Sequence, residues 1–213
     1  DLNRFSIKGF GPVPSNNTGT NPGNGFEAFF ETTLDEVMKG QSKNSISLLQ
    51  EFGEAQKIKL ETEFPKGSFS AHLKDIARVI KSGLYIPFIV TEVGGWDSHR
   101  DQGNEKGQLA NRLKEFGDSI NAFTEALGPK MQDVVLVTVT EFGRTVKENG
   151  SKGTDHGHGS CYFVVGQNIK TKTVHADWKD LKTENLYEGR DLPVNTDFRE
   201  VFADILSNQF ALN

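Results

Sequence analysis

The feature that most constrains the fold is a long amphipathic stretch between two continuous apolar runs. The runs are YIPFIVTEV at residues 85–93 and DVVLVTVT at residues 133–140. Both are rich in β-branched residues, which is typical of strands buried on both faces. Between them, residues 103–127 keep apolar side chains at helical spacing, and Gly128–Pro129 predicts the end of that helix. A strand, a helix and a strand of these lengths predict a βαβ unit, in a partly parallel sheet covered by helices.

Further elements are predicted on both sides of this unit. Apolar residues at helical spacing predict helices at residues 26–37, 68–83 and 197–208, and SCYFVVG at 160–166 predicts a third strand. Residues 1–25 end in a stretch rich in Gly, Pro, Asn, Ser and Thr, which predicts an extended arm or linker. We therefore expect residues 26–213 to form a single α/β domain, with a helical part at 26–84 and a sheet part at 85–213.

Composition excludes several classes of protein. Hydrophobic residues make up 35% and charged residues 25% of the 213 residues, as in ordinary globular proteins. The net charge is −5 and no basic stripe is present, so a nucleic-acid partner is not expected. No apolar run reaches about 18 residues, so no membrane span is expected. The single cysteine, Cys161, excludes an internal disulfide framework.

Three polar, glycine-containing clusters adjoin the predicted strands. EVGGWDSHRDQG follows the first strand, TEFGRTVKENG follows the second, and GTDHGHGS precedes the third. Loops at the carboxyl ends of parallel strands converge at one edge of a sheet. The third cluster reaches that edge only by a longer loop or by an antiparallel strand. The candidate site residues in these clusters are Asp97, His99, Glu141, Arg144, Asp155, His156 and His158.

The residue types suit a metal site. Imidazole and carboxylate groups together bind Zn, Mn or Fe, and neighbouring glycines let the backbone approach closely. Arg144 has the fork geometry that binds a phosphate or sulfate oxygen. Each pattern also has a plainer interpretation: the DHGH stretch fits a turn that caps a strand, and Glu141 with Arg144 fits a salt bridge.

Four motifs carry a family resemblance. In this order, GGWDSH, VTVTEFGRTVKENGSKGTDHGHG, YFVVG and GRDLPVNTDFREVFADIL resemble the DUF1501 family, mostly bacterial proteins similar to the alkaline phosphatase and sulfatase superfamily. The resemblance implies an α/β fold, a three-layer α/β/α sandwich with a mostly parallel sheet, alkaline-phosphatase-like and incomplete at its N-terminal side. The family's glycine-rich first strand and nucleophile position are not found in these 213 residues. Members of the family are often exported, which hints at a periplasmic or secreted location.

The resemblance also implies a ligand set for a divalent metal, among Zn, Mn, Fe, Mg and Ca. Asp97 and His99 match the superfamily's Asp…His pair, at a tighter spacing. Two mappings remain for the other ligands. In the first, TDHG matches the strand-ending Asp–His motif, so Asp155 and His156 are ligands.

In the second mapping, TEFG occupies that position because it directly follows a predicted strand. Phe142 then stands where a histidine ligand is expected, and His156 or His158 becomes the late histidine ahead of CYFVVG. We prefer this mapping because it keeps the order of the strands.

Two functions follow from these observations. The first is a metal-dependent hydrolase-like domain acting on small phosphate or sulfate esters, with part of a full site in this chain. Its metal ligands would be Asp97, His99, Asp155, His156 and His158, with Glu141 and Arg144 in catalytic roles. The alternative is a non-catalytic structural or interaction subunit that keeps the scaffold, binding a protein partner or the missing N-terminal half.

Overall fold

The computed structural model describes residues 5–6, 48, 50–167, 169 and 174–210. Most of the predicted arm at 1–25 and the whole predicted helix at 26–37 lie outside these residues. The chain divides into two compact units. Unit 1 comprises Asp1–Val93 and Asp118–Leu127, and unit 2 comprises Gly94–Gly117 and Gly128–Asn213.

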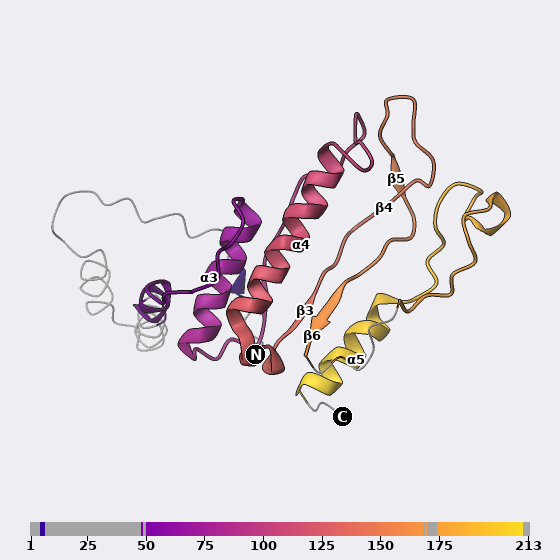
Figure 1. The fold of residues 1–213 in the computed structure, drawn as a ribbon. Coiled ribbons are helices and arrows are strands. Elements are labelled where there is room, and N and C mark those ends of the chain that lie inside the picture. Colours follow the sequence, from indigo (N-terminus) through magenta and orange to yellow (C-terminus); the bar gives the residue numbers. More distant parts are fainter. Residues whose placement is uncertain (1–4, 7–47, 49, 168, 170–173, 211–213) are drawn as a thin grey trace, which may run out of the picture. The chain divides into compact units, whose positions relative to one another are not determined.

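Two helices supply the apolar core of unit 1. Helix α3 (Ser68–Ser82; Figure 1) ends where Gly83 adopts the left-handed conformation and donates its N–H to the carbonyl oxygen of Ile80. The last turns of helix α4 (Gln108–Leu127) also belong to this unit, and Lys81 Nζ donates to the carbonyl oxygen of Ala126 at 2.6 Å. The buried apolar side chains of the two helices are Phe69, Leu73, Ile76, Ala77, Val79, Ala122, Phe123, Ala126 and Leu127.

A short parallel pair also belongs to the described part of unit 1. Strand β1 (Phe5–Ser6) pairs with β2 (Ile89–Val90), which lies inside the apolar run at 85–93. Within the described residues, two residues of that run pair as a strand. The chain leaving β2 is fixed to α3, since Thr91 Oγ1 lies 3.2 Å from His72 Nδ1.

In unit 2, the apolar runs at 133–140 and 160–166 contain an antiparallel pair. Strand β3 (Val135–Val137) pairs with β6 (Val164–Gly166), and the last residue of β3 faces the first residue of β6. Beyond the pair, the Thr138 N–H donates to the carbonyl oxygen of Phe163 at 2.9 Å. The chain segments that follow β3 and precede β6 therefore start side by side. A three-layer sandwich stays a prediction.

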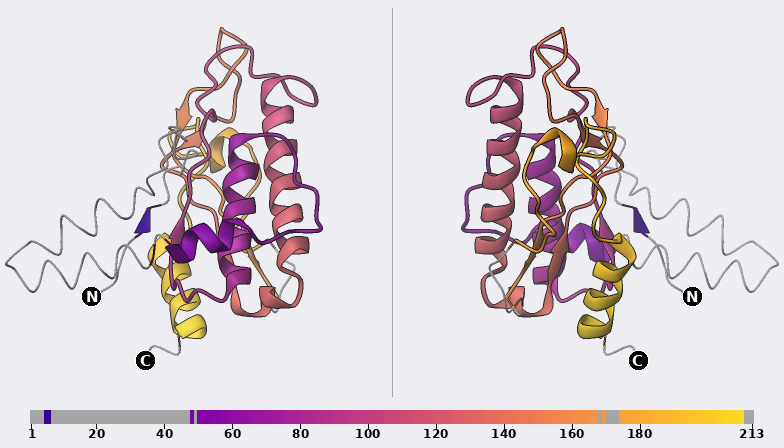
Figure 2. Two further views of the ribbon diagram at one scale, coloured as in Figure 1. Left: turned by 90° about the vertical axis from the view of Figure 1, so that its left-hand side faces the viewer. Right: turned by 90° about the vertical axis from the view of Figure 1, so that its right-hand side faces the viewer.

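Those two segments pair again farther along. Strands β4 (Gly143–Arg144) and β5 (His156–Gly157) lie side by side (Figures 1 and 2). They pair in antiparallel fashion, with Arg144 opposite His156. Other elements in the described residues include a helical segment at 50–56, two 3₁₀ turns, η1 (Gly128–Asp133) and η2 (Thr183–Asn185), and helix α5. The β4–β5 pair brings the TEFGR and DHGH motifs together.

The two units differ in how much apolar surface they bury. Of the buried hydrophobic residues in the described ranges, all but Met131 and Leu186 belong to unit 1. The polar loops of unit 2 are instead joined largely by hydrogen bonds. Within the described residues, no helix combines the length and apolar character needed to cross a membrane.

Helix α5 (Phe198–Phe210) begins at a carboxylate cap. Asp197 Oδ1 accepts the Arg199 N–H at 2.9 Å, and the Arg199 side chain also binds this carboxylate, so the hydrogen bonds from Arg199 lower the pKa of Asp197 from 3.8 to about 2. Because the pKa is lower in the folded protein, the ionised Asp197 carboxylate stabilises the fold at pH values above 3.8. This contribution is lost as the pH falls toward about 2.

We expect Asp197→Ala to lower the melting temperature by a few degrees at pH 7, because the helix loses its cap. The difference from wild type should shrink as pH falls from about 4 to about 2, where the wild-type carboxylate is itself protonated. Thermal denaturation followed by circular dichroism over this range measures both effects. Asp204→Ala removes a carboxylate from the middle of the same helix and is the control. An equal loss in both variants would contradict the capping role.

Candidate metal centre

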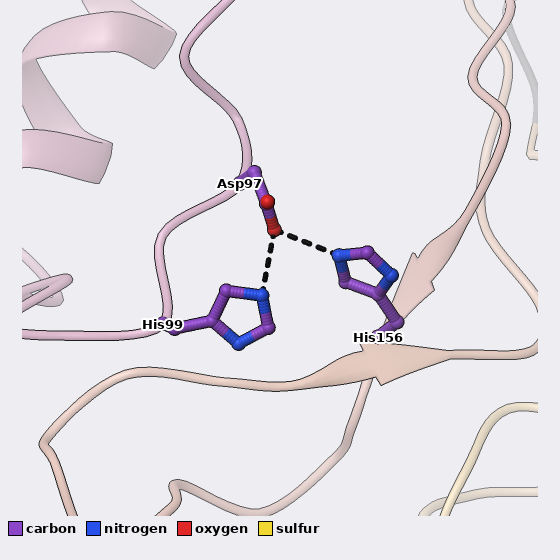
Figure 3. Close-up of side chains that lie close together, drawn as sticks. All are labelled: Asp97, His99 and His156. Atoms are coloured by element: carbon purple, nitrogen blue, oxygen red, sulfur yellow. Dashed lines mark hydrogen bonds and ion pairs between the residues drawn. The ribbon is translucent and has the colours of Figure 1, made fainter.

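Three side chains from two loops of unit 2 converge on one point (Figure 3). Asp97 and His99 come from the segment after β2, and His156 is the first residue of β5. One potential ligand atom from each lies within 4.8 Å of the others. Asp97 Oδ1 is 2.9 Å from His99 Nε2 and 2.7 Å from His156 Nε2. All three residues are exposed, so solvent and small molecules reach the cluster.

A close backbone approach brings the two loops together. Asp101 and Gln102 donate their N–H groups to the carbonyl oxygens of Ser151 and Lys152, at 3.0 and 2.9 Å. Gly153 is buried at the contact, and a Cβ atom there would lie 2.3 Å from the carbonyl carbon of His99. Only glycine permits this approach. The glycine ahead of the DHGH motif therefore sets the spacing of the loops.

Arg144 of β4 holds both loops from one side. Its Nη1 donates to the carbonyl oxygen of Thr154 at 2.7 Å, and its Nη2 donates to the carbonyl oxygen of Trp96 and to Asp97 Oδ1, the latter at 2.9 Å. The guanidinium also lies over the Phe142 ring, 5.0 Å from its centroid. We predicted that the Arg144 guanidinium binds a phosphate or sulfate oxygen. In the structure it donates to two backbone carbonyls and to the carboxylate of Asp97.

Asp155 contacts the cluster from outside. Its Oδ1 lies 2.8 Å from His99 Nδ1, while the other nitrogen of that ring faces Asp97. Asn149 Nδ2 donates to Asp155 Oδ1 and to the carbonyl oxygen of His99, both at 3.0 Å. A carboxylate on the far nitrogen fixes the tautomer and orientation of a ligating histidine. Asp155 is therefore placed to orient His99.

Both carboxylates are stabilised in their charged form. The hydrogen bond from His156 is the largest cause that lowers the pKa of Asp97, and the Arg144 hydrogen bond acts in the same direction. The hydrogen bond from His99 lowers the pKa of Asp155, followed by that from Asn149. The ionised carboxylates therefore stabilise the folded loops at pH values above their ordinary pKa of 3.8. That contribution is lost as pH falls through the lowered values.

The other candidate residues lie apart from the three-residue cluster. The His158 ring stacks on Tyr187, with centroids 4.2 Å apart, and Glu141 is exposed and not in the cluster found among the described residues. Phe142 stacks on the His156 ring at 4.0 Å. An aromatic ring therefore covers one side of a ligand candidate, at the position where one of our mappings expected a histidine.

Asn149 is a site residue that sequence reasoning missed. Its Oδ1 accepts the N–H groups of Ser151 and Gly153 at 2.9 and 3.1 Å, so it organises the turn before the DHGH motif as well as contacting Asp155. An Asn ahead of a Gly-Ser pair signals such a turn. That signal was present in ENGSKG, but it does not reveal the contact with Asp155.

The protein thus combines helices and two-stranded sheets with a solvent-exposed cluster of one carboxylate and two imidazoles. The chain belongs to the DUF1501 family, described as a protein of unknown function, whose model matches residues 16–213. The predicted family is thus confirmed, while the likeness to the alkaline phosphatase and sulfatase superfamily stays a prediction. No curated protein and no solved structure matches the chain.

Proposed function

We propose that unit 2 is a metal-dependent hydrolase-like domain, of the alkaline phosphatase and sulfatase kind, acting on phosphate or sulfate esters. Asp97, His99 and His156 would hold a divalent cation. The observation that carries the proposal is the convergence of their ligand atoms within 4.8 Å, from positions 59 residues apart for Asp97 and His156. Two imidazoles with one carboxylate favour Zn, Mn or Fe over Mg or Ca, which prefer all-oxygen sites.

The surrounding residues support a ligand role for His99 in particular. Its Nδ1 faces Asp155, which leaves Nε2 directed at the point where the other two ligand atoms converge. Asn149 in turn holds Asp155. A carboxylate behind a histidine in this way is the usual support of a ligating imidazole, since it fixes the ring and raises its basicity.

The exposure of the cluster suits a hydrolase. Three protein ligands leave coordination positions open, and the exposed side chains leave room for an ester and a water molecule. When bound, a divalent cation supplies Lewis acidity toward an ester oxygen and lowers the pKa of a bound water. Arg144 holds Asp97 in place from the protein side.

A non-catalytic role for the same residues has one specific observation in its favour. Asp97 already joins His99, His156 and Arg144 through hydrogen bonds, and this network by itself ties the two loops together. Phe142 against His156 adds packing rather than a ligand. In this alternative, the cluster only stabilises the two loops of a scaffold or interaction subunit.

Elemental analysis of protein purified without chelator separates the two functions. A metal site predicts about one divalent ion per chain, and the loaded protein should hydrolyse an aryl phosphate or an aryl sulfate. Incubation with Zn, Mn and Fe in turn identifies the preferred ion. A folded protein that takes up none of these ions would overturn the proposal. If that protein also loses its fold on Asp97→Asn substitution, the structural alternative is supported.

A further inference from the structure

Residues 187–192, which contain none of the site residues predicted from the sequence, pair with the chain that follows β4. Successive N–H groups beyond β4 point in opposite directions: Thr145 donates to the carbonyl oxygen of Asp155 at 3.0 Å, and Val146 donates to that of Arg190 at 3.2 Å. Thr145 is also bridged to Asp191 in antiparallel fashion. The chain beyond β4 therefore lies between the segment that carries His156 and the segment that carries Arg190. The backbones of these two outer segments are therefore two strand spacings apart, which is about 10 Å.

Two more contacts fix this segment to the DHGHG motif. The Gly159 N–H donates to the carbonyl oxygen of Leu192 at 2.7 Å, and a Cβ at Gly159 would lie 2.6 Å from the carbonyl oxygen of Pro193. The ring of His158 stacks on Tyr187 at 4.2 Å. The segment is therefore attached to the chain immediately after the ligand candidate His156.

Arg190 is bound by its neighbour Asp191 and is still accessible. Its Nε and Nη2 donate to Asp191 Oδ1 and Oδ2, at 3.0 and 2.9 Å. The Asp191 side chain is 3% exposed, whereas that of Arg190 is 58% exposed. A buried carboxylate thus anchors one edge of the guanidinium. Its Nη1 makes no hydrogen bond to any of the residues that the structure describes, and it remains available to an anion.

The charges around Arg190 favour its protonated form. Asp191 is the main cause that raises the pKa of Arg190, and Glu188 and Asp155 add smaller charge effects. Asp155 is the carboxylate that contacts His99. By contrast, the Arg144 side chain is only 22% exposed and binds two backbone carbonyls. Of these two arginines, Arg190 is the one that can receive an anionic group from solution.

We propose that Arg190 binds the oxyanion of the substrate, a phosphate or sulfate group, beside the Asp97–His99–His156 cluster. This inference rests on the proposed function for its substrate class. It assigns the anion-binding role that we predicted for Arg144 to a different arginine. Asp191 acts as a positioning residue, since it orients the guanidinium without contacting the anion.

Calorimetric titration of the whole chain with inorganic phosphate, in metal-free and zinc-loaded forms, tests this assignment. We expect Arg190→Gln to weaken phosphate binding about tenfold or more, because a charge-assisted hydrogen-bond donor is lost. Zinc uptake should not change. Arg199→Gln is the matched control, because Arg199 is also exposed and paired with an aspartate, and it should bind phosphate as wild type does.

Arg190→Lys is a second variant that tests whether misfolding explains the result. It keeps a positive charge beside the buried Asp191 but lacks the two-pronged guanidinium. We expect it to retain the wild-type circular dichroism spectrum and to weaken phosphate binding severalfold. Wild-type phosphate affinity in both Arg190 variants, or no phosphate binding by wild type in either form, would overturn the assignment. Failure of zinc uptake would count against the proposed function alone, since the metal-free titration still reports on Arg190.

Discussion

His99→Ala and His156→Ala should each lower the affinity for zinc by more than about a hundredfold, whereas His158→Ala should leave it unchanged. Each of the first two variants removes one of three converging ligand atoms. Loss of an outer partner of a ligand already costs about 10–100-fold in metal affinity, so loss of a ligand itself costs more. His158 lies only two residues from His156, but its ring stacks on Tyr187.

Competition with a chromophoric chelator measures these affinities, and circular dichroism checks that each variant is folded. The His158→Ala variant makes the comparison sharp, because it carries the same substitution in the same loop. Equal zinc affinity in all three variants and wild type would show that the metal lies elsewhere. A loss in His158→Ala as large as in His156→Ala would instead return His158 to the ligand set implied by the family resemblance.

Gly153→Ala should disrupt the site as strongly as the loss of a ligand, although it removes no polar group. The added methyl group would lie 2.3–2.6 Å from backbone atoms of His99 and Arg100, so the loops must separate. Such overpacking costs about 1–3 kcal/mol of the free energy of unfolding. It should also abolish tight zinc binding, because His99 moves away from His156.

Gly150→Ala is the control in the same loop. A Cβ at that position meets no atom within 4 Å, so the same substitution should leave stability and zinc affinity close to the wild-type values. Urea denaturation gives the free energies of unfolding, and zinc titration gives the affinities. If Gly153→Ala behaves like Gly150→Ala in both measurements, the close approach of the loops does not determine the site.

The sequence predicted the helices of the described region well, because their patterns are long and periodic. Residues 68–83, 103–127 and 197–208 correspond to α3, α4 and α5. The apolar runs did contain strands. In the described residues, however, each of these strands is only two or three residues long. Strand length depends on which partner lies alongside, and a run of β-branched residues carries no information about its partner.

The site was predicted in part for a similar reason. The density of His and Asp in DSH and DHGH pointed to the residues that converge, Asp97, His99 and His156. The partners of Arg144 could not be foreseen, since two of them are backbone carbonyls that any sequence provides. The sequence also did not reveal that, of the neighbours Arg190 and Asp191, the arginine is exposed and the aspartate is buried.

Few apolar side chains are buried in the described part of unit 2, and this has a consequence for its fluctuations. Urea promotes an opening in proportion to the surface that the opening exposes. Parting two loops that are joined by hydrogen bonds and glycine contacts exposes little surface, so low urea concentrations should hardly change how often they part. The packed helices of unit 1 supply most of the buried apolar side chains among the described residues, and their opening should respond steeply. The loops that carry the polar cluster can thus open transiently while the helical core stays folded.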